Sequence, residues 1–422
     1  MLEQCVQWIA LYHLREKDMN RISSGAFKHV FIWASLLLLP TFMFSACALG
    51  GGSGGGTPTA TASSGRSTAT PGTTATLTSG VRLGPQSCPD AVKDPSHWDP
   101  IIPPEEDSPT PIHVGRVSCG NLIGQNSLQA LVNAYHEGTG QILDVYVYTN
   151  ITNARPSLLF KLQALYKGDA KISGYNTIIT QEVDGNASIN KGQGNAELTR
   201  DLRREFKWSD NAATFVQVAF SGIYPDLTRY QAEADQAQVN QGQDSWKLSA
   251  TQVALHLAMD LLKWPADAQT TVVSGGGKSD LNAVVNVVSA TPASVSIKVS
   301  LIRLEGNTNG GIWIVTSVES PNMSITVPQS LERLTSPTTV TGKGNAFEGS
   351  IGMVRILDHL YDDIGHAPAT GVQGQGNTIF SASVTYTSSF QGGSQEGLVA
   401  LFGENNAGGA VPAVIVKVLL SA

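Results

Sequence analysis

Short apolar runs separated by turn residues dominate residues 120–220, and this pattern predicts β-strands. Two runs, residues 128–135 and 142–148, flank Gly138-Thr139-Gly140, as expected for a hairpin. The second run is rich in Val and Tyr, which favour strands. Further strands are predicted at residues 158–166, 175–183, 203–208 and 214–220. A helix over residues 127–136 is the alternative for the first run.

The pattern changes to a helical period after residue 224. A first helix is predicted to begin at Pro225 and to end before Gly242. The second begins with the capping box Ser249-x-x-Gln252 and stops at Pro265. Its apolar stripe consists of Val253, Leu257, Leu261 and Trp264. Strands are then predicted at residues 281–288, 295–304 and 312–318. This order of two helices and a meander resembles small cone-shaped α+β domains of the nuclear-transport-factor or cystatin type.

Strict alternation of apolar and polar residues marks the end of the chain. Phe380, Ala382, Val384 and Tyr386 alternate with hydroxyl side chains. Val414, Val416 and Val418 also fall at every second position, which predicts that Lys417 between them points to water. About seven short strands in roughly a hundred residues predict a β-sandwich.

A set of motif positions lies within the same stretch. They are Ser336-Pro337, residues 340–349, residues 355–358, Phe380, Phe390, Gly397, Glu404 and Gly408. These residues resemble the immunoglobulin-like domain of bacterial spore germination proteins. The resemblance implies an immunoglobulin-like sandwich over residues 323–422. It also implies a non-enzymatic accessory module outside the cytoplasm, in the cell envelope. Proteins with this module are often lipidated.

An uncharged apolar run, residues 30–44, lies near the N-terminus and follows Lys28. Fifteen residues are too few for a spanning helix, which needs roughly 20, but suit the core of a signal peptide. The run ends in Phe44-Ser45-Ala46-Cys47, which resembles the processing site of bacterial lipoproteins. By that resemblance the chain is cut before Cys47, and the Cys47 thiol is diacylated. Two acyl chains anchor a protein stably, whereas one does not.

Two alternatives concern this N-terminal region. A plain signal peptide or an uncleaved anchor would leave Cys47 without lipid. Translation from Met19 would give a conventional positively charged start and would leave Cys5 untranslated. The Gly/Ser/Thr-rich residues 50–80 contain a single charge, Arg66, and are predicted to form a flexible tether.

Composition and charge limit the classes of function. The 422 residues carry a net charge of −7, which argues against a nucleic-acid partner because such proteins need a basic surface. Only one stretch is apolar enough to enter a bilayer, which argues against a polytopic membrane protein.

The four cysteines, at positions 5, 47, 88 and 119, can be assigned in turn. Export removes Cys5 and lipidation uses Cys47, so Cys88 and Cys119 are left in an oxidising compartment. We expect a disulfide between them, because a metal pair would lack close His or Cys partners.

His256 and Asp260 lie one helical turn apart beside the apolar stripe. They could be a general base with its orienting carboxylate in a pocket, although the interpretation that we favour is an exposed surface pair. Asp184-x-Asn186-x-Ser188-x-Asn190 has the spacing of a calcium loop but lacks its Gly and Glu positions, which favours a polar turn. No catalytic, cofactor-binding or metal-binding residues are therefore predicted.

The sequence predicts a multi-domain, mainly β protein. The expected parts are a signal peptide (1–46), a lipidated tether (47–86), a β-rich domain (87–204), an α+β domain (205–322) and the immunoglobulin-like sandwich (323–422). The expected function is a lipoprotein on the extracellular face of the cell membrane, with possible links to sporulation or germination. It would bind or scaffold an envelope protein or glycan without catalysis and without a cofactor. The alternative is an envelope enzyme or small-ligand binder with a pocket in residues 205–322.

Overall fold

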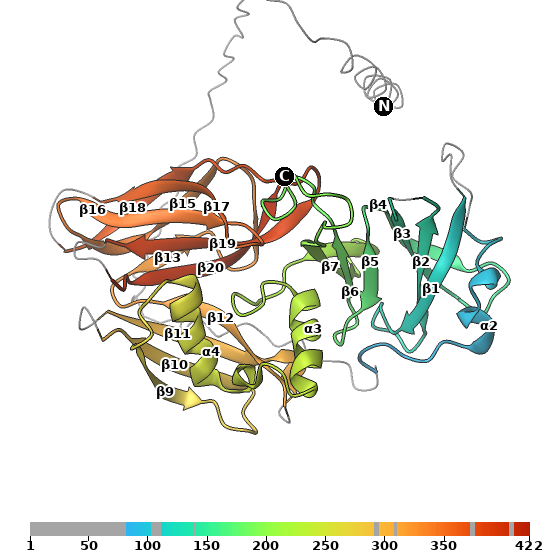
Figure 1. Ribbon diagram of the computed structural model, residues 1–422, viewed down its shortest axis with the longest axis horizontal. Coiled ribbons are helices and arrows are strands. Elements are labelled where there is room, and N and C mark those ends of the chain that lie inside the picture. Colours follow the sequence, from blue (N-terminus) through green and yellow to red (C-terminus); the bar gives the residue numbers. More distant parts are fainter. Residues whose placement is uncertain are drawn as a thin grey trace, which may run out of the picture. The chain divides into compact units, whose positions relative to one another are not determined.

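A computed structural model describes residues 82–102, 111–138, 140–290, 295–307, 310–371, 376–404 and 409–422 (Figure 1). All of the described residues belong to one compact unit. The expectations for Cys5, Met19, the signal peptide, Cys47 and the tether up to residue 81 lie outside the described residues, as does Gly408. The described part is mostly β, as predicted.

Two antiparallel four-stranded sheets follow one another between residues 112 and 218. The first contains β1 (Ile112–Gly120), β2 (Gln129–His136), β3 (Leu143–Thr149) and β4 (Ser157–Leu165). The second contains β5 (Asp169–Ile172), β6 (Ile178–Glu182), β7 (Leu202–Ser209) and β8 (Thr214–Val218). The predicted strands are confirmed, and the alternative helix over residues 127–136 is wrong. The sequence analysis missed β1 and β5.

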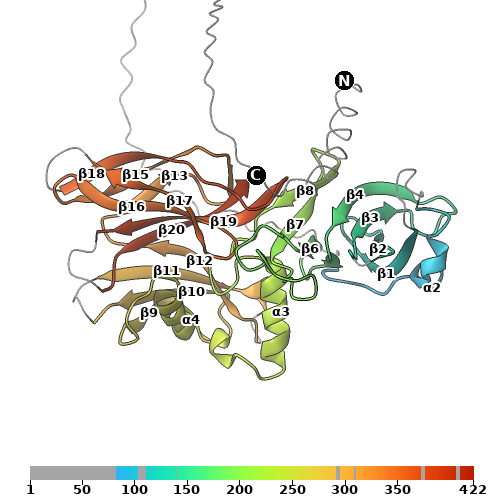
Figure 2. The same cartoon turned by 45° about the horizontal axis from the view of Figure 1, so that its top comes forward.

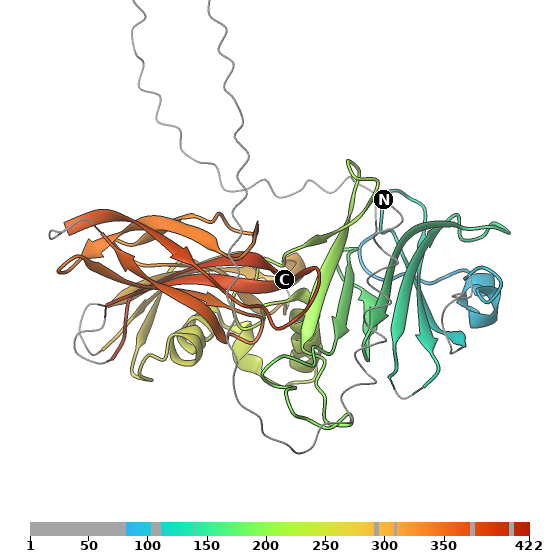
Figure 3. The same cartoon turned by 90° about the horizontal axis from the view of Figure 1, so that it is seen from above.

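These two sheets pack face to face around a common apolar core (Figure 3). Strand β5 contacts β1 and β2, while β8 contacts β4, so the edges of the two sheets are matched. The first sheet contributes Leu131, Leu143, Val145, Val147 and Leu165 to the core, and the second contributes Ala170, Ile172, Ile178, Phe206 and Phe215. Alternation along β2 and β3 sends every second side chain into this core.

Two helices and a four-strand meander come next. Helix α3 (Arg229–Asn240) begins after Thr228, whose side chain accepts a hydrogen bond from the Gln231 amide. The predicted start at Pro225 is therefore wrong by four residues. Helix α4 (Ala250–His256) continues as a π-helical turn (Leu257–Leu261), and Ser249 caps it as predicted. The meander contains β9 (Gln269–Gly275), β10 (Asn282–Val288), β11 (Ser296–Arg303) and β12 (Trp313–Glu319), of which β9 was not predicted.

The remaining strands form two layers. They are β13 (Ser324–Val327), β14 (Glu332–Leu334), β15 (Thr338–Ala346), β16 (Ser350–Leu357), β17 (Asp363–Thr370), β18 (Gly376–Val384), β19 (Ser394–Gly403) and β20 (Ala413–Ser421). One layer has the strand order β13-β15-β18, and the other contains β17-β16-β19-β20. Val340, Phe380 and Val384 from the first layer pack with side chains of the second, such as Ile356, Leu401 and Val418.

The second layer and the helix-bearing meander belong to a single sheet. Strand β12 pairs with β20 at Val318 and Ile415, which gives the order β17-β16-β19-β20-β12-β11-β10-β9 (Figure 2). Strands from both sides of the predicted boundary at residue 322 thus share one sheet. A common core joins Val253 and Leu257 of the α4 segment to Leu398 of β19.

Lys417 corrects one expectation of the sequence analysis. Its side chain is completely buried rather than directed to water. The Lys417 ammonium lies 2.8 Å from the Glu396 carboxylate and donates to the main-chain oxygen of Leu227. Period-two alternation failed here because neighbouring parts of the chain cover both faces of β20.

Candidate functional site

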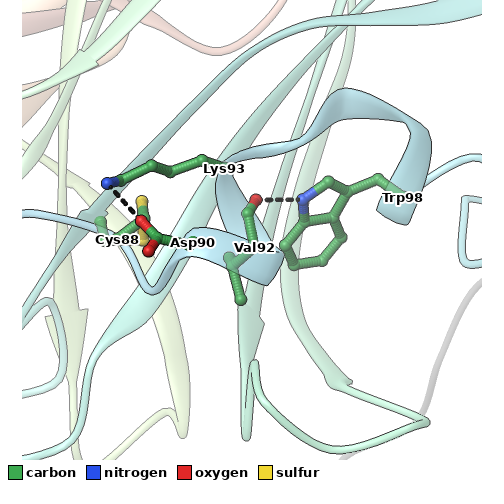
Figure 4. Close-up of a disulfide and its surroundings, with 6 residues drawn as sticks. Cys88, Asp90, Val92, Lys93 and Trp98 are labelled. Carbon is green, nitrogen blue, oxygen red and sulfur yellow. Dashed lines mark hydrogen bonds and ion pairs between the residues drawn. A yellow bond between two sulfur atoms is a disulfide. The ribbon is translucent and has the colours of Figure 1, made fainter.

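Cys88 and Cys119 form the predicted disulfide, with their Cα atoms 5.2 Å apart (Figure 4). Cys119 lies in β1, whereas Cys88 lies two residues before the start of the short helix α2 (Asp90–Lys93). The fully buried Trp98 follows, and its indole donates a hydrogen bond of 2.9 Å to the main-chain oxygen of Val92. Together with β1 to β3, this segment forms an apolar cluster on the first sheet. The disulfide therefore fastens a covering segment to the sheet.

His256 and Asp260 form the expected pair on the α4 segment, with Nδ1 and Oδ2 separated by 3.3 Å. The His256 ring stacks on Trp246 at 4.1 Å between ring centroids, and Asp260 accepts a hydrogen bond from Tyr224. The two side chains are 33% and 53% exposed. Neither residue lines the cleft described below. Their contacts with each other, with Trp246 and with Tyr224 are those of a pair on the protein surface.

The predicted polar turn at Asp184 also has local hydrogen-bond partners. Asp184 accepts from the Asn186 amide (2.9 Å) and from the Ser389 hydroxyl. The Asn190 amide donates to the main-chain oxygen of Asp184 and to the carboxylate of Asp201. Across the residues that the structure describes, no group of three or more His, Cys, Asp or Glu side chains is placed to hold a metal ion.

A cleft of about 540 Å³ lies where the first two sheets meet. Its lining comes from the start of β1, the end of β2, the turn before β3, the start of β5 and the loop before β7. The lining residues are His113, Tyr135, His136, Glu137, Gly138, Gln141, Gly168, Asp169 and Arg200. Its volume falls within the roughly 300–1,000 Å³ of small-molecule sites. We call it the β2–β5 cleft.

The aromatic ring of Tyr135 is seated against the backbone of β1. A β-bulge between Val114 and Arg116 interrupts the register of β1 with β2. A Cβ atom at the bulged Gly115 would lie only 2.7 Å from the Tyr135 ring. The absence of a side chain at Gly115 therefore allows the ring to lie close to the strand. His113 is paired with Tyr135 across the two strands, with 6.1 Å between their ring centroids.

Asp169 is held in one orientation at the start of β5. Its carboxylate accepts hydrogen bonds from the Arg116 guanidinium and from the Tyr230 hydroxyl (2.6 Å). Burial raises the pKa of Asp169, but the Tyr230 hydrogen bond and the charges of Arg116 and Arg200 outweigh it, so the pKa is below its usual value. The carboxylate thus stays ionised and remains an acceptor at neutral pH.

The hairpin between β2 and β3 is braced at its base. His136 Nε2 lies 3.2 Å from the buried Asp144 carboxylate. Asp144 also accepts from the amide of Ala164 at 2.9 Å. Through Asp144, these contacts link the turn that carries Glu137 and Gln141 to strand β4. This side of the cleft is therefore held by the first sheet.

Sequence reasoning missed this cleft. His113 and His136 show no metal-ligand spacing in the sequence, so nothing in their pattern marks them as members of one site. Tyr135, Asp169 and Arg200 come from three different segments, and only the pairing of β1 with β2 and the contact with β5 bring them together. The one available signal was the polar sequence Tyr135-His136-Glu137 at a predicted hairpin end.

Comparison with known proteins adds no relative, because no protein-family model and no curated protein matches this chain. In the described parts of the chain, none of the helices has the length and apolar character needed to cross a bilayer.

Proposed function

We propose that this protein is a membrane-anchored extracytoplasmic lipoprotein that binds or scaffolds another component of the cell envelope without catalysis. The observation that carries the proposal is the disulfide between Cys88 and Cys119. Disulfides persist in exported proteins and are rare in the reducing cytosol. This agrees with the apolar run at residues 30–44 and with the lipoprotein-like site at Cys47.

The proposed architecture has a lipid on Cys47, a flexible tether and a folded head. Within the head, we assign residues 323–422 to an immunoglobulin-like sandwich of the type found in spore germination proteins. The facing layers β13-β15-β18 and β17-β16-β19-β20, with a common core, support this assignment. Helix α4 packs on the β9 to β12 meander, and Ala232 and Val239 of α3 cluster with Ile314 of β12, which supports an α+β arrangement over residues 205–322. A role in sporulation or germination rests on the sequence resemblance.

The β2–β5 cleft is the proposed binding surface of the head. It gathers polar side chains from strands β1, β2 and β5 and from the loops before β3 and β7, and binding sites are commonly built from loops on a rigid scaffold. The partner would be an envelope protein or glycan. No step of chemistry is assigned to the cleft. Two of its polar groups are held by neighbours outside the lining: Asp169 by Arg116 and Tyr230, and His136 by Asp144.

The test is metabolic labelling with a palmitate analogue, followed by separation of membrane and soluble fractions. Wild-type protein should carry the label and sediment with membranes. Cys47→Ala should lose the label and leave the membrane fraction, because one sulfur carries the anchor. Cys5→Ala is the matched control and should behave as wild type. Label retained by Cys47→Ala, or unlabelled wild-type protein in the cytosol, would contradict the proposal.

A further inference from the structure

We propose that the β2–β5 cleft binds a neutral saccharide. This inference deepens the proposed function and rests on it only for the location of the site outside the cytosol. The expected ligand is an oligosaccharide, not a small anion or a polypeptide. The reasons lie in the groups that line the cleft.

The polar groups of the cleft suit a ligand that is covered with hydroxyls. Glu137 and Asp169 supply carboxylate acceptors, Arg200 supplies donors, and Gln141 supplies both. Each sugar hydroxyl can donate one hydrogen bond and accept others, so it matches such a mixed lining. An apolar ligand would leave these groups without partners, which costs free energy.

The charges of the cleft argue against an anionic ligand. Arg200 is balanced by the carboxylates of Glu137 and Asp169 within the lining. The neighbouring Arg116 is already engaged by Asp169 and by the main-chain oxygen of Ala170. An incoming anion would therefore be repelled by the carboxylates of Glu137 and Asp169, and Arg200 and Arg116 already face these carboxylates. A neutral polyol meets no such repulsion.

Tyr135 supplies the flat apolar surface that a sugar ring needs. One face of a pyranose ring presents C–H groups, which pack on aromatic rings, while the hydroxyls at its edge form hydrogen bonds. The bulge at Gly115 places the Tyr135 ring against the β1 backbone, with His113 beside it. Aromatic and hydrogen-bonding groups are thus combined in one cleft.

The site is organised before any ligand arrives. The Asp169 carboxylate is oriented by Arg116 and Tyr230, and the β2–β3 hairpin is tied down through His136 and Asp144. Groups that are already fixed lose little conformational entropy on binding. This raises the affinity for saccharides, which generally bind proteins weakly. Because Glu137, Gln141 and Arg200 are exposed, the cleft opens to solvent and can accept part of a longer chain.

The experiment is calorimetric titration of the full chain with three neutral tetrasaccharides, built from glucose, mannose or N-acetylglucosamine. We expect at least one to bind with a dissociation constant below about 1 mM. Arg200→Ala, at an exposed loop position, should weaken that binding at least about tenfold, and Tyr135→Ala should do the same. Phe347→Ala, which removes another exposed aromatic ring far along the sequence, should leave binding unchanged.

Three results would overturn the inference. They are no heat from any tetrasaccharide, binding that both cleft variants retain, and stronger binding of inorganic phosphate or of a polypeptide in the same cleft. The outcome is separable from the anchoring test. A protein that lacks lipid can still bind the sugar, and a lipidated protein can fail to bind it.

Discussion

The carboxyl group of Glu305 lies next to that of Glu233, a residue of helix α3. Burial raises the pKa of Glu305, and the hydrogen bond and negative charge of Glu233 raise it further, to about 7. Glu233 accepts a hydrogen bond from the Gly174 amide (2.8 Å) and lies 3.6 Å from the Lys171 ammonium. Glu305 therefore keeps its proton to a higher pH than an ordinary carboxyl group.

This pair predicts a pH-dependent stability. Between pH 4.5, the ordinary pKa of Glu, and about pH 7, Glu305 is protonated in the folded protein but ionised in the unfolded chain. The free energy of unfolding therefore falls as the pH rises through this window. Glu305→Gln should match wild type near pH 4.5 and be more stable at pH 8 by about 1 kcal/mol, allowing for solvent screening. Urea unfolding at both pH values measures this difference.

The control for that experiment is Glu319→Gln. Glu319 is an exposed carboxylate 2.6 Å from Lys298, and its replacement should change stability little at either pH. A stability difference between Glu305→Gln and wild type that is equal at both pH values would contradict the assignment.

The buried ion pair of Lys417 and Glu396 predicts strong coupling. Both side chains are almost fully buried, and Glu396 also accepts from the Phe220 amide at 3.1 Å. Lys417→Met should cost about 3 kcal/mol of unfolding free energy, because it leaves a buried carboxyl without its cation. The double variant Lys417→Met with Glu396→Gln should recover much of that loss. Denaturant unfolding of the two single variants and the double variant measures the coupling, and simple additivity would refute it.

At the scale of elements, the disulfide should set the stability of the covering segment. It closes a loop with a sequence separation of 31, for which chain-entropy arguments give about 3–4 kcal/mol. Cys88→Ser and Cys119→Ser should each lower the unfolding free energy by that amount. Their joint replacement should cost no more than either alone, because one bond is lost in every case. Chemical denaturation under non-reducing conditions tests this, and additive losses would show that the cysteines act separately.

Strands and helices with clear periodicity could be predicted from the sequence. The run at residues 128–135 and the capping box at Ser249 correspond to β2 and α4. Strand β9 was missed because its residues are mostly exposed and do not alternate in character. Strand β1 was missed because a bulge between Val114 and Arg116 interrupts its alternation. The start of α3 was misplaced because Pro225 looked like a first-turn proline, while Thr228 makes the cap.

The candidate site could not be predicted in the same way. Its chemistry depends on Tyr135 meeting Gly115 across a bulge and on Asp169 meeting Arg116 from another sheet. Both contacts depend on strand register and sheet packing, which local patterns do not encode. Burial of Lys417 escaped prediction for a related reason, since a distant carboxylate and carbonyl supply its partners.

We propose that the whole molecule consists of an anchor, a tether and a binding head. An anchored head should concentrate at the membrane surface, where a weak sugar site gains from many copies acting together. Cleft variants such as Arg200→Ala should therefore leave fractionation with the membrane unchanged while reducing retention on an oligosaccharide resin. Loss of membrane association in Arg200→Ala would show that anchoring and binding are not separate properties.

The most direct test of the account is the mass of the mature N-terminus. Protein purified from membranes would be digested and its first peptide identified by mass spectrometry. The account predicts a peptide that begins at Cys47 and carries a diacylglycerol group on its sulfur. A first peptide that retains residues 30–46, or an unmodified Cys47, would contradict it.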